Sequence, residues 1–311
     1  MAHCEYNDRH RLKDAGFFFD FNESKRWYTN SISVASALRE YLDESAKNKI
    51  KQISLDIAPW GGCDTPLIPK DKKLDPHQIK AFNFCTTRNH SYLAFDAGLG
   101  KTPISVTLIN ALADKSFPAL IIVPPFLISN WCREIKEWQI KNYSVQIVSK
   151  RGAFILDQYT NILIVPDSLI ADKDVFNNII KFKYSIVIAD EVQRFLNSES
   201  LRTRALFGHD GIGLCALAPK RVFLSGTPMR RGPMDLFPVL KANAWDSVNY
   251  MSHHHYGLRY CEGFEKRVSY NQKVWDYSGS CNLPELKTKI FDTFILRESL
   301  TDNIKELSGK L

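Results

Sequence analysis

The strongest signal in this chain is the segment Tyr92-Leu93-Ala94-Phe95-Asp96-Ala97-Gly98-Leu99-Gly100-Lys101-Thr102. A short apolar run comes first, a turn with two glycines follows, and Lys101-Thr102 opens a segment with apolar residues at helical spacing. Glycine adopts backbone angles that a Cβ would forbid, so such a turn can direct several backbone N–H groups towards one phosphate. The following helix adds the positive end of its dipole. The segment therefore predicts a phosphate-binding loop rather than an ordinary turn between strand and helix.

The residues of this loop have separate predicted roles. Backbone N–H groups of Gly98, Leu99 and Gly100 would surround phosphate oxygens. The ammonium group of Lys101 would reach the β- and γ-phosphates, and the hydroxyl of Thr102 would bind Mg²⁺.

The composition is typical of a soluble globular protein, with 311 residues, 44% hydrophobic and 24% charged, and a formal net charge of +7. Most of the Lys and Arg surplus falls between residues 51 and 240, which suits nucleic acid but also many nucleotide enzymes. Prolines and charges interrupt every apolar run before it reaches membrane-spanning length, so no membrane partner is expected.

The cysteines indicate a cellular compartment. All seven are scattered, without a Cys-x-x-Cys pair, which predicts a reducing intracellular environment. We expect a cytoplasmic protein, of a prokaryote or a phage-infected host, rather than a nuclear one. The run His253-His254-His255 is expected in a polar loop rather than at a metal, because adjacent histidines cannot easily share one tetrahedral ion.

Residues 1–50 are predicted to form a small ββα module. Aromatic runs at residues 17–19 and 27–28 flank a polar turn, and an amphipathic stretch follows. The aromatic side chains are expected in the core of this module, and stacking on DNA is the alternative. Lys25 and Arg26 are candidates for contacts with a nucleic-acid backbone. Residues 51–73, rich in Pro, Gly, Asp and Lys, predict a linker.

From residue 74 the pattern alternates between strands and helices. Short apolar runs separated by helical patterns predict an α/β fold, with a parallel sheet covered by helices on both faces. In such a sheet ligands bind beyond the carboxyl ends of the strands, where the phosphate loop lies. The expected strands are 92–95, 119–123, 145–148, 162–165, 185–189 and 221–224, and the expected helices are 104–113, 129–138 and 174–182.

Two further strand ends should lie at the same edge of the sheet. The run 186–189 ends in Asp190-Glu191. Asp190 suits Mg²⁺, because a hard cation prefers carboxylate oxygen, and Glu191 suits the deprotonation of an attacking water. The run 222–224 ends in Ser225-Gly226-Thr227-Pro228, which brings hydroxyl groups to this edge.

Together these segments resemble the superfamily-two helicase-like ATPases, and in particular their Swi/Snf-type branch of double-stranded DNA translocases. The segments that carry the resemblance are residues 74–78, 98–102, 123–127 with Asn130-Trp131 and Glu134, 190–193 and 225–228.

The resemblance implies a RecA-like ATP-binding lobe over residues 74–240, with ATP and Mg²⁺ as ligands. Gln78 would read the adenine, and Gln193 takes the place of the usual His of the acidic box. Ser225 and Thr227, with Gln193, would couple hydrolysis to movement. The implied DNA contacts are Pro124, Asn130 and Arg230.

The tail narrows the resemblance to the HARP-type annealing helicases, which remodel forks. The resemblance is carried by Tyr256-Gly257-Leu258-Arg259-Tyr260-Cys261 and Trp275-Asp276-Tyr277-Ser278-Gly279-Ser280, with Asn282-Leu283, Glu285-Leu286 and Ile295-Leu296-Arg297. On this resemblance residues 1–50 are similar to the small HARP-like module, and residues 241–311 form a helical extension leading to an absent second lobe.

These features predict an ATP hydrolase of the helicase or translocase type, of which this chain is the first lobe. Its partners would be duplex or forked DNA and a second RecA-like lobe, in cis or in trans. That lobe would supply an arginine finger, without which ATP hydrolysis should be slow. Two alternatives remain open: a nucleotide- and DNA-binding module that does not hydrolyse ATP, and the lobe of an RNA helicase.

Overall fold

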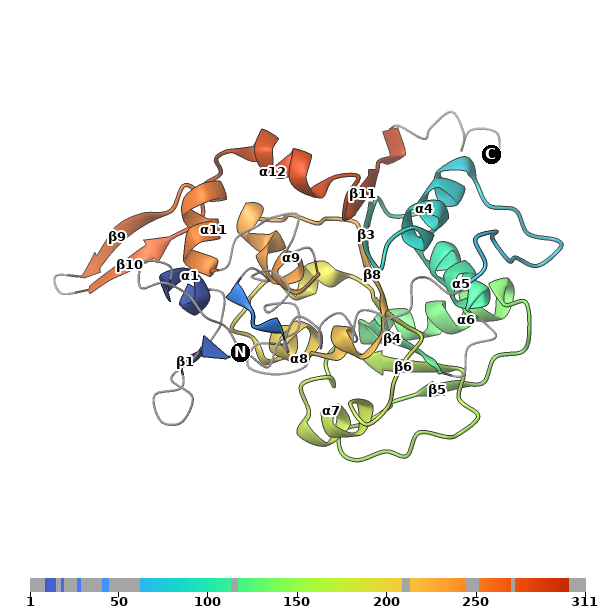
Figure 1. Ribbon diagram of the computed structural model, residues 1–311. Helices are drawn as coiled ribbons and strands as arrows, with labels where there is room; N and C mark the ends of the chain where they lie inside the picture. Colours follow the sequence, from blue (N-terminus) through green and yellow to red (C-terminus); the bar gives the residue numbers. More distant parts are fainter. Residues whose placement is uncertain are drawn as a thin grey trace. The chain divides into compact units, whose positions relative to one another are not determined.

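The computed structural model describes residues 9–14, 18–19, 27–28, 41–44, 62–112, 117–208, 213–243, 252–269 and 272–301. The chain divides into two compact units (Figure 1). The larger unit consists of Pro59–Pro228 and Phe291–Leu311, and the smaller of Met1–Ala58 and Met229–Ile290. The first segment of the larger unit ends at Pro228, near the expected boundary at residue 240, and residues 291–311 belong to the larger unit as well.

A seven-stranded parallel sheet forms the centre of the larger unit, in the order β11-β3-β8-β7-β4-β6-β5. This confirms the predicted parallel α/β architecture. Residues of β4, β6 and β7 are buried throughout, because helices and loops cover both faces of the sheet. The strands are β3 (His90–Phe95), β4 (Ala119–Val123), β5 (Val145–Ile147), β6 (Ile162–Pro166), β7 (Ile186–Ala189), β8 (Lys220–Ser225) and β11 (Ile295–Glu298).

Helices lie on both faces of this sheet. On one face Ile121 and Ile188 share a core cluster with Phe82, Ile104 and Trp131, which come from three different helices. Those helices are α4 (Pro76–Thr86), α5 (Lys101–Ala111) and α6 (Ile128–Trp138).

On the other face Phe223 of β8 lies 5.8 Å, between ring centroids, from Phe207 of α8 (Leu201–Phe207). The unit also contains α7 (Lys173–Ile179), η3 (Pro125–Leu127), η4 (Val192–Arg194) and η5 (Leu214–Leu217). Among the described residues no helix is long and apolar enough to cross a bilayer.

Strand β11 corrects the expected helical extension. Its four residues pair in parallel with β3, from Ile295 opposite Tyr92 to Glu298 opposite Phe95. A run this short has no periodicity that separates strand from helix, and its partner strand lies some two hundred residues earlier in the sequence. The tail therefore adds an edge strand to the main sheet.

The smaller unit mixes helices with two antiparallel strand pairs. Strand β1 (Phe18–Phe19) pairs with β2 (Trp27–Tyr28), as the predicted module requires, but α1 (Arg9–Asp14) precedes them and was not expected. Most of the predicted helix near residues 34–42 lies outside the described residues. The remaining elements are η6 (Pro233–Leu236), α9 (Phe237–Asn243), α11 (His253–Tyr260), β9 (Phe264–Ser269), β10 (Gln272–Asp276) and α12 (Leu283–Ile290).

The histidine run does not form a loop. His253, His254 and His255 make up the first turn of α11, where the side chain of Ser252 caps the helix by accepting from the backbone N–H of His255 at 3.1 Å. The ring of His253 packs edge-on against Phe237, with centroids 5.2 Å apart. The expectation of a polar loop was wrong because the serine cap and the aromatic contacts make this stretch part of the fold.

A buried lysine of β8 holds the carboxyl end of α4. Lys220, at the start of β8, is almost fully buried and its Nζ donates to the carbonyls of Cys85 and Arg88 at the end of α4. Burial lowers the pKa of Lys220 to about 8. Burial likewise raises the pKa of the Cys85 thiol to about 11, so that thiol stays neutral near pH 8.

This lysine predicts a pH dependence of stability. Between pH 8 and the ordinary lysine pKa the unfolded chain keeps a proton that the folded chain has lost, so the contribution of Lys220 to stability rises with pH. The free energy of unfolding of the wild type, relative to Lys220→Met, should increase by about 1 kcal/mol from pH 8 to pH 9. Urea titrations at both pH values measure it, with the exposed Lys183→Met as control. An unchanged difference would contradict the prediction.

Candidate active site

The predicted phosphate loop joins β3 to α5. Gly98 has φ +86° and Gly100 has φ +74°, both in the left-handed region that favours glycine. Gly100 is the residue before the first turn of α5, and Lys101 and Thr102 begin that helix. Leu99 between the glycines is fully buried, which fixes the loop to the core. The loop therefore has the backbone conformation and the helix start that anion binding requires.

The side chain of Lys101 folds back over this loop. Its Nζ donates to the carbonyl oxygens of Phe95, at 2.7 Å, and Asp96, at 3.2 Å. Burial lowers the pKa of Lys101, and the carboxylates of Asp190, Glu191 and Asp96 oppose that shift. A cation held among these groups can exchange two carbonyl contacts for phosphate oxygens.

The edge strand β11 holds the start of the loop. The backbone N–H of Asp96 donates to the carbonyl of Glu298 at 3.2 Å, and the Asp96 carboxylate accepts from the backbone N–H of Leu300 at 3.0 Å. Lys80 of α4 pairs with Glu298 at 2.6 Å. The strand that the sequence did not predict thus fixes the entrance to the predicted loop.

Gln78 lies against the phosphate loop. Its Oε1 accepts from the backbone N–H of Asp75 at 2.9 Å, and its Nε2 is 3.5 Å from the carbonyl of Leu99. The neighbouring His77 ring places Nε2 3.1 Å from the same carbonyl, a contact that the sequence analysis missed. The first turn of α4 and the phosphate loop are therefore one connected structure.

Gly100 provides a test of this connection. A Cβ on Gly100 would come within 2.1 Å of Gln78 Nε2, whereas a Cβ on Gly98 would meet nothing within 4 Å. Both substitutions by alanine cost about 1–2 kcal/mol of backbone strain, but only Gly100→Ala should also displace Gln78. We expect Gly100→Ala to reduce the preference for ATP over GTP roughly threefold or more, and Gly98→Ala to leave it unchanged. Competition binding with ATP and GTP measures this preference. An equal change in preference for Gly100→Ala and Gly98→Ala would contradict the assignment of Gln78 to the adenine.

Asp190 follows β7 and is held by two donors. Trp131 Nε1 donates to its Oδ2 at 2.9 Å, and the backbone N–H of Glu191 donates to its Oδ1 at 2.8 Å. Burial raises the pKa of Asp190, and these hydrogen bonds and the charge of Lys101 oppose the shift. The carboxylate of Asp190 and the partly buried hydroxyl of Thr102 are a set of hard oxygen donors, which fits Mg²⁺.

Glu191 begins a chain of polar contacts that reaches β8. Its backbone has φ +50°, unusual for a residue other than glycine, and this turn brings its side chain to Gln193. Gln193 Nε2 donates to the Glu191 carboxylate, and Gln193 Oε1 accepts from Ser225 Oγ at 2.5 Å. Ser225 Oγ in turn accepts from the backbone N–H of Thr227 at 3.0 Å. The structure thus joins the residues predicted for catalysis and for coupling.

A buried aspartate that the sequence analysis did not select anchors this turn. Asp167 follows β6 and is completely buried, and Arg194, next to Gln193, donates to its Oδ2. Arg202 Nη1 lies 3.6 Å from the same oxygen. Asp167 therefore holds the 3₁₀ turn that contains Gln193 through Arg194, and the start of α8 through Arg202.

The residues predicted to contact DNA are dispersed. Pro124 is buried at the end of β4, and Asn130 on α6 accepts from Arg133 at 2.5 Å. Arg230 belongs to the smaller unit, where its side chain is exposed and its backbone N–H donates to Asp235 at 2.8 Å. Lys25 and Arg26 lie outside the described residues. Their role in DNA binding stays a prediction.

The fold is that of an SNF2 ATPase core. Two solved structures from Sulfolobus solfataricus, a SWI2/SNF2 ATPase core in complex with double-stranded DNA and a SWI2/SNF2 ATPase core domain, match with TM-scores of 0.59 and 0.60. Sequence identity is 18% and 20%, and each match covers 79% of this chain and 47% of the solved one. The sequence matches the family described as SNF2-related domain over residues 77–305, and the chain belongs to that family.

Relatives with longer chains share this domain. The "SWI/SNF-related matrix-associated actin-dependent regulator of chromatin subfamily A-like protein 1" of Bos taurus is 30% identical over 238 residues, which is 76% of this chain and 23% of the relative. The "Chromatin remodeling factor mit1" of Schizosaccharomyces pombe is 28% identical over 241 residues, 71% of this chain and 16% of the relative. The chain thus spans a quarter or less of these relatives.

These relatives overturn the expected location. They are eukaryotic proteins named for chromatin, which is nuclear material, so the expectation of a cytoplasmic rather than a nuclear protein was wrong. Scattered cysteines indicate a reducing environment but do not separate the cytoplasm from the nucleus, so the sequence pattern lacked the information to make that choice.

Proposed function

We propose that this chain is the ATP-binding first lobe of an SNF2-type DNA translocase, related in kind to the annealing helicases. The observation that carries the proposal is that the lysine of the phosphate loop feels the charges of Asp190 and Glu191, and that hydrogen bonds connect Glu191 to β8. Lys101 is within electrostatic reach of Asp190 and Glu191, and Glu191 is joined through Gln193 to Ser225. Two carboxylates that act on a partly buried lysine at a phosphate loop are the groups that hydrolysis of ATP requires.

In the proposed reaction Lys101 and the backbone of the phosphate loop hold the β- and γ-phosphates of ATP. Glu191 takes a proton from a water molecule, the water oxygen bonds to the γ-phosphorus, and the bond to the β–γ bridging oxygen breaks. Thr102 and Asp190 would hold Mg²⁺, which neutralises charge on the phosphates when bound. Loss of the γ-phosphate changes what Glu191 contacts, and Gln193 and Ser225 pass that change to β8.

DNA is the proposed nucleic-acid partner. The support is that one matching structure is an ATPase core in complex with double-stranded DNA, and that the relatives are named for chromatin. Forked DNA follows from the resemblance of the tail to annealing helicases. For duplex RNA, the partner of the alternative RNA-helicase interpretation, the described residues offer no supporting feature.

A second lobe is part of the proposal. The solved ATPase cores are about twice as long as the part that this chain matches, which supports a site completed from outside the matched region. An arginine from such a lobe would raise the rate by roughly 10³–10⁵-fold. We therefore expect slow hydrolysis by this chain alone and faster hydrolysis when a second RecA-like lobe is added.

Nucleotide binding tests the proposal directly. A fluorescent ATP analogue should bind the wild type in the presence of Mg²⁺ and bind Lys101→Ala roughly tenfold more weakly, since a charge-assisted contact to phosphate is lost. The exposed Lys150→Ala is the control. Hydrolysis is then compared with forked DNA and with duplex RNA at one stated salt concentration. Equal binding by Lys101→Ala would refute the ATP site, and binding without hydrolysis under any condition would favour the non-hydrolysing module.

A further inference from the structure

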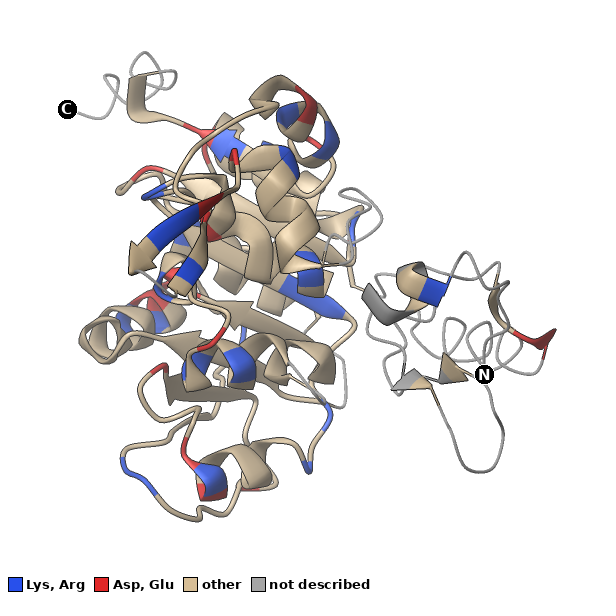
Figure 2. Ribbon diagram, turned by 90° about the vertical axis from the view of Figure 1, so that its left-hand side faces the viewer, with Lys and Arg blue, Asp and Glu red and all other residues tan. Residues whose placement is uncertain are grey.

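The hairpin of β9 and β10 in the smaller unit is an exposed surface that the proposed ATP site does not use. The two strands pair antiparallel, with Trp275 opposite Glu265 and Lys273 opposite Arg267. Opposed residues point to the same face of a hairpin, so these four form one face, here called the tryptophan face. Phe264 lies opposite Asp276 on the other face. In Figure 2 the side of Figure 1 that bears the hairpin faces the viewer, with blue and red segments along its strands.

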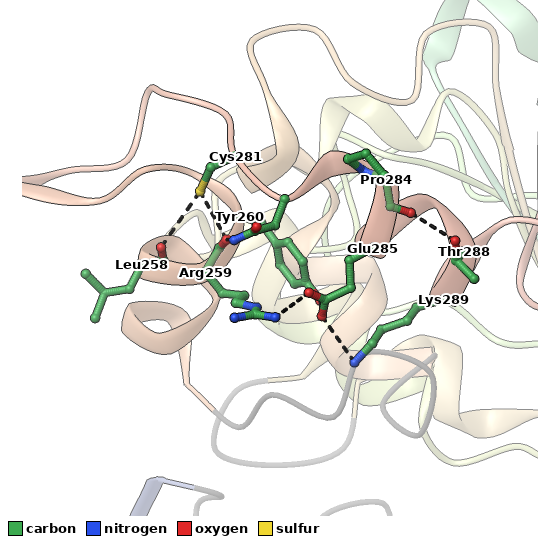
Figure 3. Close-up of polar contacts among 9 residues, drawn as sticks. Leu258, Arg259, Tyr260, Cys281, Pro284, Glu285, Thr288 and Lys289 are labelled. Atoms are coloured by element: carbon green, nitrogen blue, oxygen red, sulfur yellow. Dashed lines mark hydrogen bonds and ion pairs between the residues drawn. The ribbon is translucent and has the colours of Figure 1, made fainter.

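The two helices that flank the hairpin, α11 and α12, are joined by polar contacts. Arg259 of α11 donates to Glu285 of α12, Tyr260 Oη donates to the same carboxylate at 3.1 Å, and Lys289 lies 3.5 Å from it (Figure 3). Arg259 is the main cause of a lowered pKa of Glu285. The thiol of Cys281 donates to the carbonyl of Arg259 at 3.0 Å. The helices before and after the hairpin are thus tied to each other.

Trp275 lies at the outer end of an aromatic stack. Its ring is parallel to that of Tyr277, with an interplanar angle of 6° and centroids 6.2 Å apart. The ring of His254 packs edge-on against Trp275 at 4.5 Å, and His254 Nδ1 is 2.7 Å from Tyr277 Oη. Tyr277 is seated on Gly257, where a Cβ would come within 2.3 Å of its ring. Trp275 nevertheless remains 43% exposed. A large aromatic ring is therefore held in place with much of its surface open to solvent.

The charges around this ring suit a polyanion. Lys273 and Arg267 share the tryptophan face, and the surface pair of Lys273 with Glu265, at 2.7 Å, is of the kind that contributes little to stability. Across the described residues between 229 and 290 there are nine Lys and Arg against five Asp and Glu. A phosphate can replace the carboxylate of Glu265 as the partner of Lys273.

We propose that the tryptophan face binds single-stranded DNA, with one base stacked on Trp275 and the adjoining phosphates on Lys273 and Arg267. Every base has a flat face that an aromatic ring can stack on, and only an unpaired base leaves its own stack at small cost. A branch point is where the proposed translocase would meet such bases. The inference rests on the proposed function for its nucleic-acid context, but the binding itself needs no ATP.

Oligonucleotide binding without nucleotide tests the proposal. A single-stranded oligonucleotide carrying 2-aminopurine should lose fluorescence on binding the wild type, because the analogue stacks. Trp275→Ala should bind it roughly 5- to 150-fold more weakly. Trp275→Tyr should restore most of the affinity. The control is Phe264→Ala, on the opposite face and similarly exposed at 52%, which should bind as the wild type does.

Two charge variants add an independent readout. Lys273→Gln should lower the slope of log affinity against log salt by about 0.7, the value for one lost phosphate contact on a single strand. Glu265→Gln should strengthen binding, since it removes the carboxylate that competes for Lys273. A purely structural role of these residues predicts neither change.

The outcomes separate this inference from the proposed function. Unchanged binding by Trp275→Ala, or an equal loss for Trp275→Ala and Phe264→Ala, would overturn the inference, as would equal losses for single-stranded and duplex DNA. If the tryptophan face instead binds a protein, Trp275→Ala should bind the oligonucleotide as the wild type does. ATP binding by the same variants is measured in parallel. If the wild type fails to bind ATP, the ATP site is refuted, and the oligonucleotide result is unaffected.

Discussion

Glu191→Gln should slow DNA-stimulated ATP hydrolysis by roughly 10²–10⁴-fold, the usual contribution of a general base, and leave ATP binding almost unchanged. The carboxylate can accept a proton from water and the amide cannot. Geometry should survive the exchange, because the amide oxygen can still accept from Gln193 Nε2. Binding should survive as well, since the proposed phosphate contacts come from Lys101 and the loop around Gly100.

The measurement is phosphate release at saturating ATP, with duplex DNA and a second lobe present, alongside titration of a fluorescent ATP analogue. Glu199→Gln is the matched control, because Glu199 lies on the surface and pairs with Arg204. Hydrolysis by Glu191→Gln at the wild-type rate would mean that another group deprotonates the water. Loss of ATP binding would mean that Glu191 holds the loop in shape rather than reacting.

The positions of the candidate ATP-site residues in the fold could be predicted from the sequence because these residues follow strands or begin a helix at short spacing. Gly98–Thr102 and Asp190-Glu191 each lie at the end of an apolar run, and the carboxyl ends of parallel strands meet at one edge. The central strands could also be predicted from the sequence. Each is a short apolar run that is buried on both faces.

The edge strand and the hairpin could not be predicted in this way. Ile295–Glu298 is too short to show a period, and its pairing with β3 depends on a contact across most of the chain. The residues of β9 are exposed on both faces, so hydrophobic burial left no alternation that marks a strand. Their structure comes from the pairing of β9 with β10 and from the packing of Trp275 against His254 of α11, which sequence spacing does not encode.

Asp167 shows a different kind of omission. It follows the apolar run of β6, as Asp190 follows that of β7, so the rule that selected Asp190 applies to it equally. No motif marks the position of Asp167, so its sequence context did not distinguish it from any other polar residue after a strand. Its partner Arg194 is adjacent to Gln193, and their ion pair became apparent only in three dimensions.

Replacing Trp131 is expected to weaken the binding of Mg²⁺. Its indole is completely buried on α6, and Nε1 donates to Asp190 Oδ2 at 2.9 Å. Trp131→Phe keeps much of the apolar volume but leaves a buried carboxylate oxygen of Asp190 without its donor. The carboxylate is then held less firmly, and its pKa rises because the hydrogen bond that lowered it is lost. Replacing a residue that hydrogen-bonds to a metal ligand typically lowers metal affinity by about 10–100-fold. We expect the Mg²⁺ concentration for half-maximal ATP hydrolysis to rise by roughly that factor.

Trp138→Phe is the matched control, since Trp138 lies on the same helix, is only partly buried and contacts Lys72 rather than a carboxylate. Thermal unfolding of both variants separates lost packing from lost metal affinity. If both raise the Mg²⁺ requirement equally, the indole only fills space. If Trp131→Phe alone raises it, α6 directly supports the metal ligand, and Asn130, the adjoining candidate for a DNA contact, shares a helix with that support. A shift of α6 on DNA binding would then reach Asp190 through the hydrogen bond from Trp131.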